Sequence, residues 1–185
     1  MPVPPPDEPA GRRTGFAPVV DARTRLLILG SLPGDASLAA AQYYAHPRNG
    51  FWRLTGGLIG RDLVTLAYPQ RLEALKAAGI GLWDVITTAR RAGSLDTAIR
   101  DPEFADLSGL IATLPTLRAV AFNGATAARS GRRTLAGAAD GLTLIDLPSS
   151  SPAHARPLAE KALAWARLGP FITGRVEGER QDVAP

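Results

Sequence analysis

The sequence contains no cysteine and only two histidines, His46 and His154. Without cysteine, the chain can form no disulfide bond, no thiolate nucleophile and no cysteine-ligated metal site. Two histidines are too few for a metal centre that is built from several imidazole ligands. The sequence therefore predicts no metal site.

Long hydrophobic runs are also absent. No apolar stretch approaches the roughly 20 residues that a membrane-spanning helix requires. The polar start MPVPPPDE lacks the apolar core of a signal peptide. We therefore expect a cytoplasmic protein that makes no contact with a membrane.

The basic charge is carried almost entirely by arginine, because only Lys76 and Lys161 are lysines among 21 basic residues. The formal net charge is +4. Arginine suits bidentate contacts with phosphate, and a basic surface attracts nucleic acid. A solvated, arginine-rich surface explains the same counts, so the charge alone leaves both interpretations open.

The chain has 185 residues, of which 45% are hydrophobic, which is enough for one domain with a sizeable core. Residues 1–15 and 174–185 are rich in proline, glycine or charge and lack apolar periodicity. This composition predicts a loose tail at each end. We expect a single domain between them, over residues 16–173.

Four short apolar runs are typical of strands that are buried on both faces of a parallel sheet. They are Leu26–Leu29, Leu82–Ile86, Ala119–Phe122 and Thr143–Leu147. Helical patterns lie between and after these runs, at Gln70–Ala78, Asp106–Leu114, Ala125–Leu135 and Pro157–Leu168. Strands that alternate with helices predict an α/β fold, here a three-layer sandwich with a central four-stranded parallel sheet.

The predicted strands end in polar or turn residues, and the carboxyl ends of parallel strands share one edge, where ligands bind. The turn Gly30–Ser37, GSLPGDAS, follows the first strand and leads into a helix. Free backbone N–H groups are expected to face the crevice there. We interpret Gly30 and Gly34 as positions whose backbone takes a conformation that residues other than glycine do not readily adopt. An ordinary strand–helix turn is the alternative.

The segment Tyr43–Trp52, YYAHPRNGFW, is the densest cluster of aromatic and polar side chains. A tyrosine beside exposed amides could stack on a planar base, and Asn49 could orient a water or bind a base edge. Alternatively the aromatic residues belong to the core, which we favour for Phe51 and Trp52. His46 fits a structural hydrogen-bonding role better than acid–base catalysis.

Asp84 and Asn123 are candidate ligand-binding residues at strand ends. Asp84 lies inside an apolar run, where a carboxylate without partners is costly. It could instead cap a helix or form a salt bridge with Arg90 or Arg91. Asn123 could equally be a turn or helix-capping residue.

The loop PSSSPAHARP follows the fourth strand and leads into a helix, which makes it a candidate phosphate-binding rim. Its candidate residues carry hydroxyl or basic side chains and are Ser149, Ser150, Ser151, His154 and Arg156. A plain polar loop is the alternative. A serine hydrolase triad is not supported, because no GxSxG motif surrounds these serines.

Together these motifs resemble the uracil-DNA glycosylase superfamily, and within it the hypoxanthine-DNA glycosylase-like branch. The resemblance covers residues 23–170 and is carried by GSLPGDAS, YYAHPRNGFW, FNG at 122–124 and SSSPAHA at 149–155. The string HPxNxFW is also similar to mismatch-specific glycosylases. The resemblance implies that a deaminated base, uracil or hypoxanthine, is flipped out of DNA and its N-glycosidic bond hydrolysed. We expect a monomer that needs neither a metal nor a cofactor.

The resemblance also implies roles for individual residues. Tyr44 matches the position that stacks on the flipped base, and Ser37 matches a polar position of the pocket. Asp84 and Asn123 would bind the base edge. Backbone amides around Ser31–Leu32 would hold the leaving base, and the serine-rich loop would grip phosphates and enter the duplex.

The sequence departs from the family at the first motif. Most relatives carry a catalytic aspartate or asparagine before the motif proline, or a glutamate one position earlier, where this chain has Leu32 and Ser31. In the hypoxanthine-type branch, the catalytic residue is the asparagine of the HPxN string, which is Asn49 here. Asn49 would orient the attacking water or stabilise the cationic sugar, and Asp35 and Asp84 are the alternatives.

At the second motif, Ser149 replaces the usual histidine. These departures motivate a rival hypothesis, in which the chain is a catalytically silent module that binds damaged or single-stranded nucleic acid. A hydrolase of free nucleosides is a further rival. Because no lysine lies close to the motifs, a Schiff-base lyase step is not expected.

Overall fold

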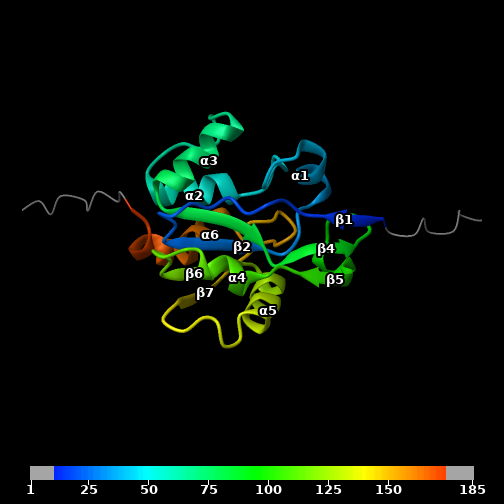
Figure 1. Cartoon of the computed structure of the whole chain (residues 1–185). Coiled ribbons are helices and arrows are strands. Elements are labelled where there is room, and N and C mark those ends of the chain that lie inside the picture. The colour runs from blue at the N-terminus through cyan, green and yellow to red at the C-terminus, as the bar shows by residue number, and fades with distance from the viewer. Residues whose placement is uncertain (1–10, 174–185) are drawn as a thin grey trace, which may run out of the picture.

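The protein, a computed structural model that describes residues 11–173, is an α/β sandwich around a four-stranded parallel sheet (Figure 1). The strands lie in the order β3-β2-β6-β7 and pair in parallel throughout. They are β2 (Leu26–Gly30), β3 (Ile80–Asp84), β6 (Ala119–Asn123) and β7 (Thr143–Leu147). The predicted fold class and sheet are thereby confirmed.

The central strand β2 is buried along its whole length and supplies core residues to both faces of the sheet. Leu26 and Ile28 belong to one cluster of buried side chains, and Leu27 and Leu29 to the other. This alternation follows from the period-two geometry of a strand. Each fully buried leucine contributes about 1.5–3 kcal/mol to folding, which accounts for the unbroken apolar run.

Helices cover both faces of the sheet (Figure 1). One face is covered by α2 (Phe51–Ile59), α3 (Tyr68–Ala77) and α6 (Leu158–Trp165), and the other by α4 (Leu107–Ala112) and α5 (Ala125–Thr134). A short helix α1 (Asp35–Ala40) and the 3₁₀ turns η1 (Asp96–Ala98) and η2 (Ala166–Phe171) complete the helical elements of the described chain. No helix within residues 11–173 is long and apolar enough to cross a membrane.

The predicted helices are present, with ends displaced by up to three residues. Gly79 follows α3 with a φ of +73°, in the left-handed region that favours glycine after a helix. Helix α2 was not predicted, because its first turn carries the aromatic residues of the YYAHPRNGFW motif. Phe51 and Trp52 on that turn are buried, which confirms their predicted place in the core.

The predicted strand Leu82–Ile86 is wrong in its bounds, because the apolar run spans the end of one strand and the start of another. β3 ends at Asp84, and β4 (Ile86–Arg90) belongs to a second, antiparallel sheet. The N–H groups of Val85 and Ile86 donate to the carbonyls of Gly30 and Ser31, which keeps this junction beside the end of β2.

The second sheet has the order β1-β4-β5, with β1 (Arg12–Thr14) and β5 (Arg100–Phe104) at its edges. β1 lies inside the segment 1–15 that was expected to be a loose tail. Residues 1–10 of that tail, and the whole expected tail 174–185, lie outside the described residues.

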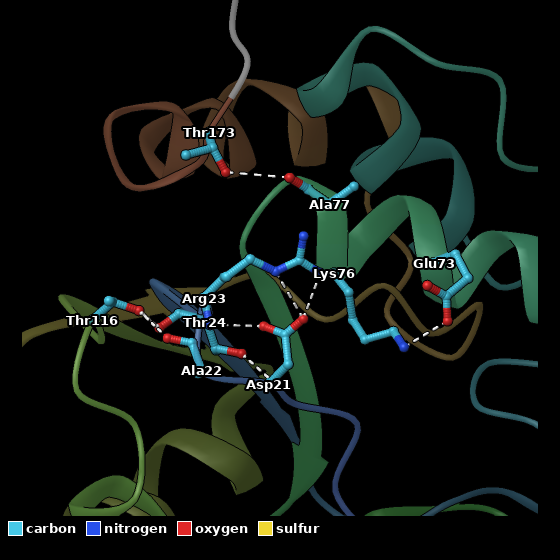
Figure 2. A network of polar contacts seen from close by, with 9 residues as sticks. All are labelled: Asp21, Ala22, Arg23, Thr24, Glu73, Lys76, Ala77, Thr116 and Thr173. Atoms are coloured by element: carbon cyan, nitrogen blue, oxygen red, sulfur yellow. Dashed lines mark hydrogen bonds and ion pairs between the residues drawn. The ribbon is translucent and has the colours of Figure 1, made fainter.

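A polar network lies beside the amino ends of the parallel strands (Figure 2). The Thr116 hydroxyl contacts the carbonyl oxygens of Ala22 and Thr24, both at 3.0 Å, and so ties the loop before β6 to the loop before β2. Arg23 pairs with Asp21 at 2.7 Å. These groups therefore serve to hold loops together, on the edge of the sheet opposite to the strand ends where the sequence predicts the site.

Candidate active site

A cavity of about 570 Å³ lies at the carboxyl edge of the parallel sheet. The ends of β2, β3 and β6 and the loops that follow β2 and β7 line it. Every predicted site residue except Arg156 is part of the lining: Ser31, Leu32, Ser37, Tyr44, Asn49, Asp84, Asn123, Ser149, Ser150, Ser151 and His154. The alternative catalytic residue Asp35 is not in the lining, and its carboxylate lies 3.6 Å from Arg13.

Gly30, the last residue of β2, lies at the centre of this edge. A Cβ atom there would come within 2.4 Å of Asp84 Oδ1 and 3.1 Å of Tyr44 Oη, so no larger residue fits. The interpretation that Gly30 and Gly34 need a conformation closed to other residues is wrong, because neither has a positive φ. Space, and not backbone geometry, requires glycine at position 30.

Tyr44 has its ring stacked on Phe51, with ring centroids 3.8 Å apart and an angle of 10° between the planes. Trp52 Nε1 donates to the Tyr44 carbonyl at 3.2 Å. These contacts hold Tyr44 with a φ of 54°, which is uncommon for a residue other than glycine and is often found at functional sites. Because Phe51 covers one face of the ring, a base would have to stack on the other.

The Tyr44 hydroxyl is buried and has no hydrogen-bond partner among the described residues. Burial raises the pKa of Tyr44, and the charge of Asp84 raises it further. The hydroxyl is therefore a neutral donor beside Asp84.

Asn49 is fixed by a tight turn at the start of α2. Its backbone N–H donates to the His46 carbonyl at 2.9 Å, and its side-chain Oδ1 accepts from the Phe51 N–H at 2.9 Å. His46 Nδ1 accepts from the Arg48 N–H at 3.1 Å, in agreement with the structural role expected for this histidine. Within residues 11–173, Asn49 Nδ2 makes no hydrogen bond, so the amide nitrogen is available to a ligand.

Asp84 is only 5% exposed, and its Oδ2 has no hydrogen-bond partner in the described part of the chain. Burial raises the pKa of Asp84 to about 7, with a further rise from the negative charge of Asp96 and an opposing effect from Arg91. The expected alternatives, a helix cap or a salt bridge with Arg90 or Arg91, are not found in residues 11–173.

Arg91 instead holds the turn that follows β2. Its fully buried guanidinium donates to the carbonyl oxygens of Leu32 at 3.3 Å, of Gly93 at 2.8 Å, and of Pro33. The Ser31 hydroxyl donates to Asp96 Oδ1 at 2.7 Å, so a second contact joins the same two segments. The turn Gly30–Gly34 is therefore positioned by the loop that follows β4.

Sequence reasoning missed both Arg91 and Asp96. Arg91 is one of two adjacent arginines, and nothing in the sequence tells which of them is buried. Asp96 follows a stretch without periodic apolar residues. The sole signal was Asp84 itself, because a carboxyl group in an apolar run implies nearby polar groups without identifying them.

Ser37 lies on α1, at the part of the large cavity that this helix lines. Its hydroxyl accepts from the Ala45 N–H at 3.1 Å, and its side chain is buried. Ser37 thereby ties α1 to the segment that carries Tyr44.

Asn123 and Ser150 clamp the end of β6 to the loop that follows β7. Asn123 Nδ2 donates to Ser150 Oγ at 2.9 Å, and Asn123 Oδ1 accepts from the Ser150 N–H at 2.8 Å. Asn123 is not a helix cap, because the residue that caps α5 is Gly124. One hydrogen of Nδ2 remains for a ligand.

Side-chain hydrogen bonds also shape the serine-rich loop. Ser149 Oγ accepts from the Ser151 N–H at 3.1 Å, and Ser151 Oγ accepts from the Ala153 N–H at 3.2 Å. Arg156, which is outside the large cavity, lines a second cavity of about 190 Å³. Lys161 lines it too, and its Nζ donates to the Ser151 carbonyl at 3.0 Å. The expectation that no lysine lies close to the motifs is therefore wrong. The two cavities share Ser150, Pro152 and His154, so they are neighbours along this loop.

The site thus combines a stacked tyrosine, two immobilised amides and a buried carboxyl group that titrates near neutral pH. In the chain from residue 11 to 173, no three His, Asp or Glu side chains come close enough to hold a metal ion. An aromatic surface with a few fixed polar groups suits a planar, polar ring such as a nucleobase.

Known proteins are similar to this chain in sequence, and a solved structure is similar to it in fold. A protein of Methanosarcina barkeri named hypoxanthine DNA glycosylase is 46% identical over 155 residues, which cover 84% of this chain and 96% of that protein. A protein of Methanosarcina acetivorans with the same name is 44% identical over 153 residues, which cover 83% and 95%. A solution NMR structure of a Methanosarcina acetivorans protein, provisionally described as a uracil DNA glycosylase, has a TM-score of 0.74 and 42% identity, and covers 85% of this chain and 99% of that one.

The sequence model of one family matches residues 17–169. This range includes the turn after β2, the serine-rich loop after β7 and all the residues that line the large cavity. The relatives are similar over nearly their whole length. The chain belongs to the uracil DNA glycosylase superfamily.

Proposed function

We propose that this protein is a monofunctional DNA glycosylase that removes deaminated bases, hypoxanthine or uracil, and so begins base excision repair. The observation that carries the proposal is the cavity in which Tyr44, Asn49 and Asp84 meet at the strand ends of a superfamily member. Hypoxanthine is favoured as a substrate because relatives at 46% and 44% identity are named hypoxanthine DNA glycosylases.

Base recognition would use the face of Tyr44 that Phe51 leaves open. Hypoxanthine and uracil both present an N–H group beside a carbonyl oxygen, so each needs an acceptor and a donor in the same plane. Asp84 and the remaining Nδ2 hydrogen of Asn123 would supply these contacts. Flipping costs a few kcal/mol of stacking and pairing, which such contacts in the pocket offset.

Departure of the base would be assisted by the protonated form of Asp84. The base carries growing negative charge as the glycosidic bond breaks, and a neutral carboxyl group can donate a hydrogen bond to it. An ionised Asp84 would repel the same charge. The raised pKa of about 7 keeps the neutral form populated near physiological pH. Backbone amides around Ser31 and Leu32 would add further donors.

Asn49 would orient the attacking water. Its Oδ1 accepts from the Phe51 N–H, which fixes the amide, and the second lone pair of Oδ1 remains for a hydrogen of that water. The water oxygen would form the new bond to C1′ of the sugar while the bond from C1′ to the base breaks and its electron pair leaves with the base. The proton that the water loses would pass to the released base or to solvent, because the neutral amide of Asn49 only accepts a hydrogen bond. Leu32 and Ser31 cannot supply a carboxylate for this step.

The test uses end-labelled duplexes that contain one deoxyinosine or one deoxyuridine, followed by alkali. A strand break at the deoxyinosine site supports the proposal. Binding without a break on either substrate would contradict it and favour the catalytically silent binding module. Free deoxyinosine is the control, because release of hypoxanthine from the nucleoside alone would instead identify a nucleoside hydrolase.

A further inference from the structure

Asp96 lines the large cavity, although the proposed reaction gives it no step of its own. It lies on η1, in the loop that follows β4, and its Oδ1 accepts a hydrogen bond from the Ser31 hydroxyl at 2.7 Å. Ser31 also lines the cavity, directly after the end of β2. The contact therefore joins a carboxylate and a hydroxyl from two walls of the site, 65 positions apart in the chain.

The negative charge of Asp96 is not neutralised by an ion pair. Within residues 11–173, no arginine, lysine or histidine lies within ion-pair distance of its carboxylate. Arg91 belongs to the same loop, but its guanidinium donates to backbone carbonyl groups of the turn after β2 and of its own loop. In this part of the chain, the Ser31 hydroxyl is the one hydrogen-bond donor to the Asp96 carboxylate.

Asp96 is held in place by contacts on both sides of it in the chain. Before it, Ser94 Oγ accepts from the Asp35 N–H at 2.9 Å, which ties the loop to the start of α1. After it, Arg100 Nη1 donates to the Thr97 carbonyl at 2.9 Å. The carboxylate is therefore fixed beside the Ser31 hydroxyl, as a preorganised functional pair requires.

The charge of Asp96 decides which way the Ser31 hydroxyl points. A carboxylate only accepts hydrogen bonds, so the hydroxyl hydrogen of Ser31 is directed at Asp96. The lone pairs of Ser31 Oγ are then left for a donor in the cavity, and water is such a donor. Because hydrogen bonds in a chain polarise one another, the carboxylate makes this oxygen a stronger acceptor.

We propose that Ser31 and Asp96 form a proton relay that activates the attacking water. As the water oxygen bonds to C1′, one of its O–H bonds breaks and that proton passes to Ser31 Oγ. The hydrogen that Ser31 already carries passes to Asp96 Oδ1, and the electron pair of the glycosidic bond leaves with the base. Asp96 is partly exposed and so returns its proton to solvent. Ser31 is thereby a catalytic residue, and Asp96 is a positioning residue that acts through it.

This inference rests on the proposed function, because the relay is a step of base release. It supplies the route by which the proton of the water reaches solvent. It also explains how the site works without a carboxylate at positions 31 and 32. The carboxylate comes instead from the loop after β4 and reaches the water through the hydroxyl of Ser31.

The relay gives the two carboxyl groups of the cavity opposite functions. Asp84 is 5% exposed, whereas Asp96 is partly exposed. Burial, and after it the charge of Asp96, raises the pKa of Asp84 to about 7. Asp84 is then the neutral donor to the leaving base, and Asp96 is the ionised acceptor behind the water. Paired carboxyl groups in unlike environments are a common basis for acid and base functions in one site.

The test is single-turnover release of hypoxanthine from a duplex with one deoxyinosine, and its main variant is Asp96→Asn. The amide oxygen of asparagine still accepts from the Ser31 hydroxyl but takes up no proton. We expect kcat to fall by about 100-fold, as for the loss of an acid–base group. Affinity for a duplex with 2′-fluoro-deoxyinosine, whose fluorine slows hydrolysis, should be unchanged. If Asp96 only held Ser31 in place, this variant would keep its kcat.

Ser31→Ala, alone and together with Asp96→Asn, tests that the two groups act in series. Each single variant should lose about as much kcat as the double variant, because either change breaks the same relay. Losses that multiply in the double variant would overturn the proposal, as would a near-normal kcat of Asp96→Asn. A loss of affinity that accounts for the whole loss of activity would overturn it too.

Asp101→Asn is the matched control, because Asp101 is an exposed carboxylate on β5 and lies outside the cavity. This variant should release hypoxanthine like the wild type. Thermal denaturation checks that every variant is folded.

Two outcomes separate the relay from the proposed function. If the wild type releases no base from deoxyinosine or deoxyuridine duplexes, the glycosylase and the relay are rejected together. If the wild type and Asp96→Asn release the base at the same rate, the relay alone is rejected and the glycosylase stands.

Discussion

At the scale of single residues, Asn49 combines a structural and a proposed chemical function in one side chain. Its Oδ1 holds the first N–H of α2, and its Nδ2 is unoccupied within residues 11–173. We predict that Asn49→Ala lowers kcat on a deoxyinosine duplex by at least about 100-fold, the usual loss for a positioned catalytic group. Single-turnover base release measures this.

Asn49→Asp is the control for the structural function, because its carboxylate can still accept from the Phe51 N–H. Both variants should remain folded, and the aspartate variant should retain more activity than the alanine variant. Near-normal turnover of Asn49→Ala would show that another residue is catalytic. Asp84 is then a better candidate than Asp35, because Asp84 lines the cavity and Asp35 does not.

Asp84 links the proposed chemistry to stability through its raised pKa. The ordinary value is 3.8 and the folded value about 7, so between these pH values the folded protein keeps a proton that the unfolded chain releases. The free energy of unfolding therefore falls as the pH rises from about 4 to 7. The difference between these two pKa values corresponds to about 4 kcal/mol. We therefore expect Asp84→Asn, whose amide cannot ionise, to be more stable than the wild type by about 4 kcal/mol at pH 8.

The measurement is urea denaturation of both proteins at pH 5 and pH 8. The stability difference between them should be small at pH 5 and larger at pH 8. An equal stability difference at pH 5 and pH 8 would mean that the pH dependence of stability does not come from Asp84. The same substitution should flatten any decline of kcat above pH 7, since the neutral amide cannot ionise.

At the scale of elements, the turn after β2 depends on the loop after β4. Arg91 satisfies carbonyl groups of Leu32, Pro33 and Gly93 inside the protein, where unpaired polar groups are costly. We predict that Arg91→Leu lowers the free energy of unfolding by about 2–4 kcal/mol. Urea denaturation measures this loss.

Arg91→Lys separates charge from shape, because lysine keeps the positive charge but lacks the planar fork that reaches several carbonyls. If Arg91 positions the turn, the lysine variant should lose kcat by about tenfold or more with little change in KM, since a misplaced group affects the reacting geometry. Full activity of Arg91→Lys would argue that charge alone matters. Arg90→Lys is the matched control, because Arg90 is the exposed neighbour.

The elements themselves were predictable to different degrees. The parallel strands could be predicted because short, fully apolar runs that end in glycine or polar residues are typical of buried strands. The junction at Asp84–Ile86 could not, because hydrophobicity continues from β3 into β4 while the pairing partner changes. The start of α2 was hidden because its aromatic side chains pack into the core and also flank the site.

At the scale of the whole molecule, the strand ends and loops of one α/β domain line the large cavity. A complete site in one protomer needs no partner, and we predict a monomer. Size-exclusion chromatography with light scattering should report a mass near 19.4 kDa, and the specific activity should not change with protein concentration. A stable dimer, or activity that rises with concentration, would contradict this.

The sequence by itself determined the fold class, the edge that carries the site and most of the residues that gather there. Apolar runs specify buried parallel strands, and the carboxyl ends of parallel strands must meet at one edge. The tertiary structure decided the partners of the buried polar groups: Ser31 with Asp96, Arg91 with Leu32, and Asn123 with Ser150, across 65, 59 and 27 residues. Local pattern carries no information on such pairs, because the distance between them depends on how strands and loops are arranged in space.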